Sequence, residues 1–462
     1  MQNTIDFINT PVVDVVNRII LDSVKAGASD IHLDHTDNFL KVRIRIDGIL
    51  NDYADIPNEV KNNVVTRIKI LSGMNITETR LPQDGAIKTE LGGMDLDMRV
   101  SCLPTKKGEK VVIRILDYSR SMQGIEYLYF SEDNYKKILK MISAPNGIIL
   151  VTGATGSGKS TTVYSFLKKL NVKGSNLITV EDPVEMEIEG INQVQVNSDI
   201  GLDFAAVLRS ILRQDPNVIM IGEIRDTETA QIAVRASITG HLVLSTLHTN
   251  NSLTTIERLI DMDVERYLLA SALSGIVSQK LARKLCDKCK TVRETTTYEK
   301  ELFKNFIGLD LTHVHDAVGC PECSGGYKGR VALQEVLLIS PNIRDAISSK
   351  ISKAELRELV YSDDVITLLQ DGLYKVIAGL TTIEEVVKLV ESDDELNAKT
   401  KLKQTIKVQE EKELEQLTTN TQKNDIQLTQ TLTQPNEIEI TPVPTPQQQP
   451  IANTIQQQNP IV

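Results

Sequence analysis

The hydrophobic positions in the first quarter of the chain alternate between helical and extended patterns. Residues 11–26 and residues 60–71 place apolar side chains at helical spacing. Residues 41–46 alternate strictly between apolar and basic side chains, and an Asp-Gly turn then leads into a return strand. Two further strands are expected over residues 94–101 and 110–116. The pattern therefore predicts a small α+β domain.

The pattern changes beyond about residue 125, where short apolar runs are separated by helical segments. The strand-like runs are residues 148–151, 177–180, 218–221 and 242–244. Such alternation is typical of an α/β domain with a largely parallel sheet. The domains and connecting segments that we predict are 1–118 (α+β), 119–126 (linker), 127–395 (α/β) and 396–462 (disordered tail). The tail is assigned as disordered because its stretch 401–462 contains 13 Gln, 10 Thr and 6 Pro.

Composition narrows the classes of protein that this chain can represent. Its 41% hydrophobic content is sufficient for a core, so wholesale disorder is excluded. The formal charge is −11, and residues 401–462, with seven acids and five bases, account for only −2 of it. The remaining residues are therefore acidic at −9, which gives no support to a nucleic-acid binder.

The chain shows no pattern of an export signal or of a membrane span. Its first basic residue is Arg18, and Asp6 interrupts the opening apolar residues, unlike a signal peptide. Its apolar runs have the length of strands, whereas a spanning helix needs about 20 residues. We expect a cytoplasmic protein, and any association with a membrane would have to come through a partner.

A glycine-rich segment after the first apolar strand fits the phosphate-loop pattern G-x-x-x-x-G-K-[ST]. Such a loop directs backbone N–H groups at phosphate oxygens, and the following helix adds positive potential. The lysine would contact the β- and γ-phosphates, and the serine hydroxyl would bind Mg²⁺. The nucleotide-binding candidates are Gly153, Ala154, Thr155, Gly156, Ser157, Gly158, Lys159, Ser160 and Thr161.

Acidic residues follow two other predicted strands. The strand over 217–221 runs into Gly222-Glu223, the arrangement of a Walker B carboxylate that shares the Mg²⁺ shell with Ser160. The strand over 177–180 delivers Glu181 and Asp182, either of which is a candidate for orienting the attacking water. Glu181 is the better candidate because it follows the strand directly.

Two histidines and two cysteine pairs complete the candidate chemistry. His241 and His248 are seven residues apart, and on one strand this odd separation places them on opposite faces. They are therefore not expected to bind one metal ion.

The pairs Cys286–Cys289 and Cys320–Cys323 suit a tetrahedral Zn²⁺ site, although 30 residues separate them. The fifth cysteine, Cys102, is expected to be a buried small hydrophobe.

Together these segments resemble the type II secretion and type IV pilus assembly ATPase family, hexameric motors of the RecA-like P-loop class. The resemblance covers about residues 11–395 and includes three further blocks, 28–32 (ASDIH), 80–85 (RLPQDG) and 208–226 (LRSILRQDPNVIMIGEIRD). It implies a RecA-like P-loop NTPase domain preceded by the α+β domain, and a homohexamer that binds ATP and Mg²⁺ between the two domains. It also implies an inner-membrane platform protein as partner.

The resemblance implies roles for single residues as well. It assigns residues 181–185 to the family's Asp box and 240–248 to its His box, which brings Glu181, His241 and His248 to the γ-phosphate side. Family members neutralise phosphate charge with arginines at the positions of Arg80, Arg99 and Arg114. For Arg99, a surface ion pair is the alternative. Arg209 and Arg213 lie one helical turn apart and fit either a solvated helix face or the nucleotide pocket.

The cysteines bear on which member of the family this is. Assembly-type members carry the tetracysteine element, so the resemblance supports an inserted structural zinc subdomain over about residues 284–328. We expect an ATPase motor that assembles pilin-like subunits for type II secretion, pilus extension or DNA uptake. The alternatives are a pilus-retraction ATPase, a RecA-like nucleic-acid motor, and a scaffold with a vestigial site. The first predicted helix begins close to Met1, so the additional N-terminal domain of many secretion-type members is expected to be missing.

Overall fold

The structure is a computed structural model that describes residues 6–116, 124–349, 351–361 and 365–390. The predicted linker over 119–126 lies mostly outside these residues, and the predicted tail over 396–462 lies wholly outside them. Among the helices described, none is both long and apolar enough to cross a bilayer.

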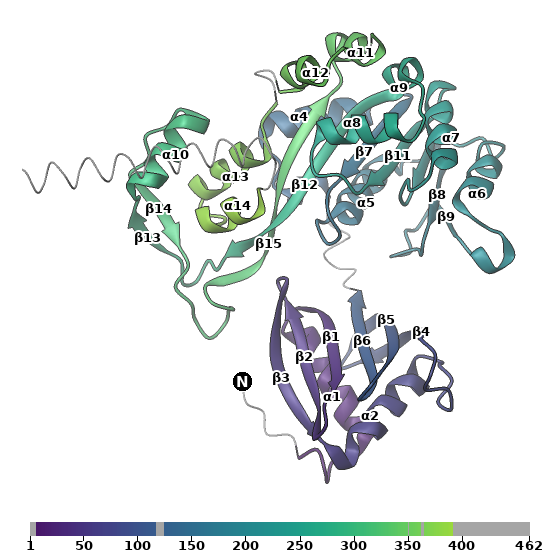
Figure 1. Cartoon of the computed structure of the whole chain (residues 1–462), viewed down its shortest axis with the longest axis vertical. Helices are drawn as coiled ribbons and strands as arrows, with labels where there is room; N and C mark the ends of the chain where they lie inside the picture. Colours follow the sequence, from purple (N-terminus) through teal and green to yellow (C-terminus); the bar gives the residue numbers. More distant parts are fainter. Residues whose placement is uncertain (1–5, 117–123, 350, 362–364, 391–462) are drawn as a thin grey trace, which may run out of the picture. The chain divides into compact units, whose positions relative to one another are not determined.

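The first part of the chain forms a six-stranded antiparallel sheet in the order β3-β2-β1-β6-β5-β4, with two helices packed on one face (Figure 1). Its elements are α1 (Val12–Lys25), β1 (Ala28–His35), β2 (Phe39–Ile46), β3 (Ile49–Pro57), α2 (Asn58–Leu71), β4 (Gln83–Leu91), β5 (Met94–Thr105) and β6 (Gly108–Leu116). Alternating residues of the inner strands, such as Ile31 and Leu33 of β1, are buried against the helices. The other face carries charged side chains, including Arg114.

The second part is built on a seven-stranded sheet in the order β15-β12-β7-β11-β10-β8-β9. All of its pairings are parallel except β12 with β15, which confirms the predicted largely parallel sheet. The strands are β7 (Gly147–Thr152), β8 (Leu177–Glu181), β9 (Asn192–Gln195), β10 (Val218–Ile221), β11 (Leu242–Leu247), β12 (Leu273–Leu285) and β15 (Tyr327–Leu338).

Helices cover both faces of this sheet, which explains why its central strands are hydrophobic without alternation. Ile148 and Leu150 of β7 face one core, and Ile149 and Val151 face the other. The helical elements over the first of these cores are α6 (Phe204–Ile211), α7 (Thr227–Ile238), α8 (Ser252–Asp261), α9 (Arg266–Ala272), α11 (Pro341–Ser348) and α12 (Lys353–Val360). Those over the second are η1 (Ile125–Leu128), α4 (Glu132–Ile142) and α5 (Lys159–Leu170).

An insertion connects the two strands of the antiparallel β12–β15 pair. It contains β13 (Thr291–Glu294), α10 (Thr297–Ile307) and β14 (His313–Asp316), with β13 and β14 forming a small antiparallel sheet. The remaining elements are η2 (Ser198–Ile200), α13 (Leu368–Ile377) and α14 (Ile383–Leu389). The insertion places one cysteine pair directly after β12 and the other shortly before β15.

Candidate active site

The carboxyl ends of four neighbouring parallel strands meet at one edge of the large sheet. The phosphate loop follows β7, Glu181 ends β8, Glu223 follows β10 and His248 follows β11. All four contribute to one cleft of about 460 Å³. The cleft also contains Ser160, Asp182, Glu185 and Arg225.

Glycines give the phosphate loop its path. Gly153 has φ +147°, and a Cβ there would lie 2.4 Å from the backbone oxygen of Gln279 on β12. Gly158 has φ +88° and caps the amino end of α5. Both φ values lie in a region that glycine adopts at little cost because it has no Cβ, whereas other residues are strained there. The loop therefore packs directly against β12 and leads into a helix amino terminus.

Lys159 and Ser157 fit a loop that receives phosphate oxygens. The Lys159 Nζ donates hydrogen bonds to the backbone oxygens of Gly153, at 2.9 Å, and Ala154, at 3.2 Å. Burial lowers the pKa of the Lys159 amine, and the carboxylate of Glu223 opposes that effect. The Ser157 hydroxyl is buried and has no hydrogen-bond partner among the described residues. An unsatisfied hydroxyl beside glycines and a buried ammonium group suits an anionic ligand.

Gln279 holds this loop from the neighbouring strand. Its Nε2 donates to the backbone oxygen of Ser157 at 2.8 Å, and its Oε1 accepts from the Thr162 hydroxyl at 2.8 Å. Gln279 is only 1% exposed, so its amide is committed to these contacts. The sequence gives no signal for this residue, because it lies far downstream of the phosphate loop on a strand that the hydrophobic pattern did not reveal.

Glu223 lies between two positive or potentially positive groups. Its Oε1 accepts a hydrogen bond from Arg225, and its Oε2 lies 3.4 Å from the His248 Nε2. The contact with Glu223 raises the pKa of Arg225. The hydroxyl of Ser160 and the carboxylate of Glu223 line the same cleft. Hydroxyl and carboxylate oxygens are the ligands that Mg²⁺ prefers, so this pair fits the predicted magnesium site.

Glu181 is a different kind of carboxylate. It is 3% exposed, and three side chains donate hydrogen bonds to it. These are the hydroxyl of Tyr164, the hydroxyl of Thr179 at 2.6 Å and the amide of Gln193 at 3.1 Å. Three of the roughly four acceptor positions of its carboxylate are thereby occupied, and this near-saturation weighs against Glu181 as the group that orients water.

The two histidines lie at opposite ends of β11. His248 follows the strand and reaches the cleft, whereas His241 precedes it and its Nδ1 lies 2.9 Å from the backbone oxygen of Ala236. The structure therefore does not bring His241 to the residues around Glu223. The two histidines do not share one continuous strand, because β11 covers only Leu242–Leu247 and they flank it.

Comparisons with known proteins show the family of this chain. The family model described as type II/IV secretion system protein matches residues 8–388. The chain belongs to this family. Type II secretion system protein E of Pectobacterium carotovorum subsp. carotovorum is 44% identical over 386 residues, which cover 83% of this chain and 77% of that protein. The type IV pilus assembly ATPase PilB of Myxococcus xanthus (strain DK1622) is 45% identical over 384 residues, which cover 82% of this chain and 68% of that protein.

A solved structure of the pilus retraction motor PilT with bound ADP matches this chain with a TM-score of 0.56. It is 27% identical, and the match covers 83% of this chain and 98% of that one. The family is of the secretion ATPase type, so the resemblance and the predicted α/β fold class are confirmed.

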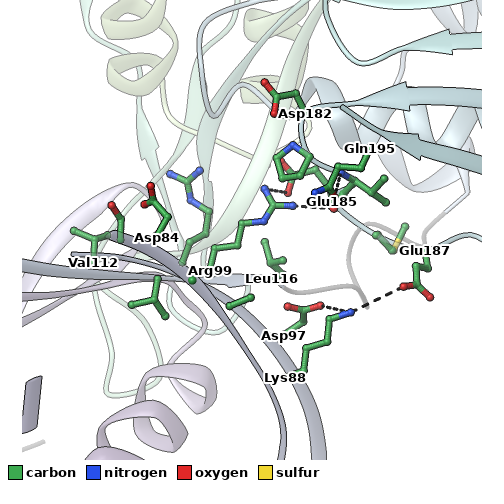
Figure 2. A pocket seen from close by; sticks show the side chains of 18 residues that line it. Asp84, Lys88, Asp97, Arg99, Val112, Leu116, Asp182, Glu185, Glu187 and Gln195 are labelled. Carbon is green, nitrogen blue, oxygen red and sulfur yellow. Dashed lines mark hydrogen bonds and ion pairs between the residues drawn. The ribbon is translucent and has the colours of Figure 1, made fainter. Parts of the chain in front are cut away.

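The secretion-family arginines occupy three different settings. Figure 2 shows Arg99 directed toward Glu185, within a cavity of about 1050 Å³. Its Nη2 donates to the backbone oxygen of Val184 at 2.8 Å, and its Nη1 lies 3.3 Å from the Glu185 Oε2. In the same view, Lys88 lies 3.5 Å from Asp97 and 4.0 Å from Glu187. Arg99 thus contacts the segment that follows β8.

Arg114 and Arg80 each contact an acidic side chain. The Arg114 Nε donates to the Asp30 Oδ1 at 3.2 Å, and Arg114 also lines the nucleotide cleft. Its strand buries the neighbouring Val111 and Ile113, so Arg114 lies on the face away from the helices. Arg80 donates to Glu78 at 2.9 Å, and its side chain is 86% exposed. It is not among the residues that line the cleft.

Arg209 and Arg213 lie on or just after α6, and neither is among the residues that line the cleft. Arg209 pairs with Glu228, and Arg213 donates to the backbone oxygen of Arg209 at 2.8 Å. Of the two interpretations left open, these contacts favour the solvated helix face.

The four predicted zinc ligands form a single cluster. The Sγ atoms of Cys286, Cys289, Cys320 and Cys323 all lie within 4.8 Å of one another. Three of the Sγ pairs are separated by 3.6 Å, 3.7 Å and 3.9 Å. Tetrahedral zinc with bonds of about 2.3 Å places its sulfurs about 3.8 Å apart, so this donor set fits the ion. The long spacing between the pairs accommodates β13, α10 and β14.

Cys102 lies apart from this cluster. It is 1% exposed, and its Sγ donates to the Glu109 Oε1 at 3.2 Å. Burial, followed by the contact with Glu109, raises the pKa of its thiol to about 12. Cys102 is therefore the small buried residue that the sequence predicted.

Proposed function

We propose that this chain hydrolyses Mg-ATP in the cleft at the carboxyl edge of its large sheet. The observation that carries the proposal is the convergence of Lys159, Ser160, Glu223 and His248 on one cleft. Their elements are separate in sequence but neighbours in the sheet, which is the arrangement of a P-loop hydrolase.

Each group has a task that its position supports. The loop N–H groups and the Lys159 ammonium would bind the β- and γ-phosphates of ATP, and Ser160 and Glu223 would hold Mg²⁺. The bound ion would neutralise charge on the phosphates. Glu223 orients the attacking water, whose oxygen bonds to the γ-phosphorus while the bond to the β–γ bridging oxygen breaks. ADP and inorganic phosphate result, and the water proton passes through Glu223 to solvent.

We further propose that the energy of hydrolysis drives assembly of pilin-like subunits, for type II secretion, pilus extension or DNA uptake. The support is the 45% identity to a pilus assembly ATPase and the 44% identity to a type II secretion system protein E, both higher than the 27% identity to a retraction motor. The cysteine cluster also favours the assembly type, because the family resemblance links that element to assembly. On this proposal the chain works as a homohexamer that contacts an inner-membrane platform protein from the cytoplasm.

Turnover by two variants tests the catalytic proposal. Lys159→Ala removes the cation that binds phosphate and is expected to abolish both nucleotide binding and hydrolysis. Glu223→Gln keeps the shape of the side chain but not its charge, and is expected to bind ATP without hydrolysing it. Binding of a fluorescent ATP analogue and release of phosphate are measured for each. Wild-type rates in both variants would contradict the proposal.

A further inference from the structure

The hydroxyl of Tyr164 connects the phosphate-binding helix to the acidic segment after β8. Tyr164 lies on α5, the helix that begins at Lys159, and is 2% exposed. Its hydroxyl donates a hydrogen bond to the Glu181 Oε2 and accepts one from the Glu185 N–H at 3.2 Å. One oxygen atom therefore links the last residue of β8 and the acidic segment that follows it, residues 182–188, to the helix that begins at the phosphate loop.

The path of the acidic segment depends on side chains rather than on regular secondary structure. Residues 182–188 form neither helix nor strand. The Val184 N–H donates to the Gln195 Oε1 at 3.3 Å, and the Ile188 N–H donates to the Gln193 Oε1 at 2.7 Å. Both glutamines belong to β9, whereas Tyr164 belongs to α5. Tyr164 thus supplies the connection to the phosphate-binding side.

The segment held in this way presents two acids to the nucleotide cleft. Asp182 and Glu185 line the cleft together with Lys159 and Glu223. Glu181, the last residue of β8, also lines the cleft, and Thr179 and Gln193 donate to its other oxygen. A buried carboxylate with several donors is a strong anchor, because hydrogen bonds to charged groups are worth about 1.5–3 kcal/mol each.

We infer that Tyr164 is a positioning residue for the ATPase reaction. Acting through Glu181 and the Glu185 main chain, it fixes the cleft-lining acids relative to the phosphate loop. This inference rests on the proposed function. Burial, together with the carboxylate of Glu181, raises the pKa of the Tyr164 hydroxyl well above its usual value. The hydroxyl therefore stays protonated, and able to donate, throughout the range of an ATPase assay.

Tyr164→Phe in the full chain removes this hydroxyl and nothing else. We expect kcat to fall about tenfold or more while KM for Mg-ATP stays within about twofold, because the phosphate loop itself is intact. The matched control is Tyr298→Phe, which removes a hydroxyl that is also buried but has no hydrogen-bond partner among the described residues. It is expected to leave both constants unchanged. A folded Tyr164→Phe protein with wild-type kcat overturns the inference.

Two additional measurements separate positioning from general stability. Amide hydrogen exchange at Glu185 is expected to accelerate about tenfold in Tyr164→Phe, without ATP, and to stay unchanged in Tyr298→Phe. If the wild-type chain hydrolyses no ATP, the proposed function fails, whereas the exchange rates still support or overturn the positioning role.

Thr179→Val removes another donor from Glu181 and provides a second variant if Tyr164→Phe does not fold. Unchanged kcat and unchanged exchange in Thr179→Val would overturn the role of Glu181 as anchor.

Discussion

The His248 Nε2 lies 3.4 Å from the Glu223 Oε2, so the ends of the adjacent strands β10 and β11 are linked at the nucleotide cleft. The imidazole contacts the carboxylate that we propose orients the attacking water. His248→Ala should therefore lower kcat by about a hundredfold or more, because a group that assists proton transfer contributes about 10²–10⁴ in rate. Steady-state release of phosphate measures the effect.

His241→Ala is the matched control for that experiment. His241 precedes the same strand, and its imidazole contacts the backbone oxygen of Ala236 rather than Glu223. Its removal should change kcat by no more than about twofold, in line with a surface substitution. An equal loss of turnover in both variants would contradict the distinction between the two histidines.

Gln279 is expected to control nucleotide affinity from outside the phosphate loop. Gln279→Leu preserves most of the side-chain volume but leaves the Ser157 oxygen and the Thr162 hydroxyl without this partner. Two buried groups that lose their hydrogen bonds cost about 2–4 kcal/mol together. Part of this cost should appear as an affinity for ATP about tenfold weaker. Titration with a fluorescent nucleotide measures it.

Gln231→Leu provides the comparison for Gln279→Leu. Its Nε2 donates to the backbone oxygen of Asp263 at 3.1 Å, in an exposed position on α7. That variant should bind ATP with wild-type affinity. If Gln279→Leu also binds normally while melting at a lower temperature, the glutamine supports only the fold.

The cysteine cluster is expected to hold one zinc ion per chain. Cys286→Ser should lose the ion and loosen the insertion that contains α10, because structural zinc contributes directly to folding energy. Metal analysis and limited proteolysis measure the two effects. Cys102→Ser should retain the full zinc content, since Cys102 lies apart from the cluster. Purified protein with no zinc and four free thiols at the cluster would refute the assignment.

Much of this site could be predicted from the sequence because its parts are local. A phosphate loop is contiguous, and a carboxylate at the end of an apolar strand, such as Glu223, is placed by the strand itself. The buried strand β10 and the helix α1 were likewise evident from hydrophobic spacing. Residue types and periodicity were sufficient for these elements.

Other features depend on contacts between distant segments. Gln279 contacts the phosphate loop only because β12 pairs with β7, and no local pattern encodes that pairing. Similarly, the saturation of Glu181 follows from the packing of Tyr164 and Gln193 around it. Likewise, Arg114 contacts Asp30 because β1 pairs with β6, and that register cannot be inferred from either strand alone.

Arg114 is expected to act late in the reaction rather than in binding. Its Nε donates to Asp30 at 3.2 Å, yet the side chain is 61% exposed and lines the nucleotide cleft. It belongs to the first part of the chain, whereas the phosphate loop belongs to the second. An arginine that completes a P-loop site only in the transition state contributes about 10³–10⁵ in rate, or about 4–7 kcal/mol. Arg114→Ala should therefore keep nucleotide binding and lose most turnover.

The contact with Asp30 offers a matched control for Arg114→Ala. Arg45 lies 3.7 Å from the same carboxylate but does not line the cleft. Arg45→Ala removes a comparable ion pair, worth less than about 1 kcal/mol at a partly exposed site, and should leave kcat unchanged. Arg99→Ala should lose less turnover than Arg114→Ala, because Arg99 contacts the main chain of Val184 and Glu185. If Arg114 only supports the fold, its variant will match Arg45→Ala in both melting temperature and kcat. Phosphate release at the normal rate by folded Arg114→Ala protein would end the hypothesis.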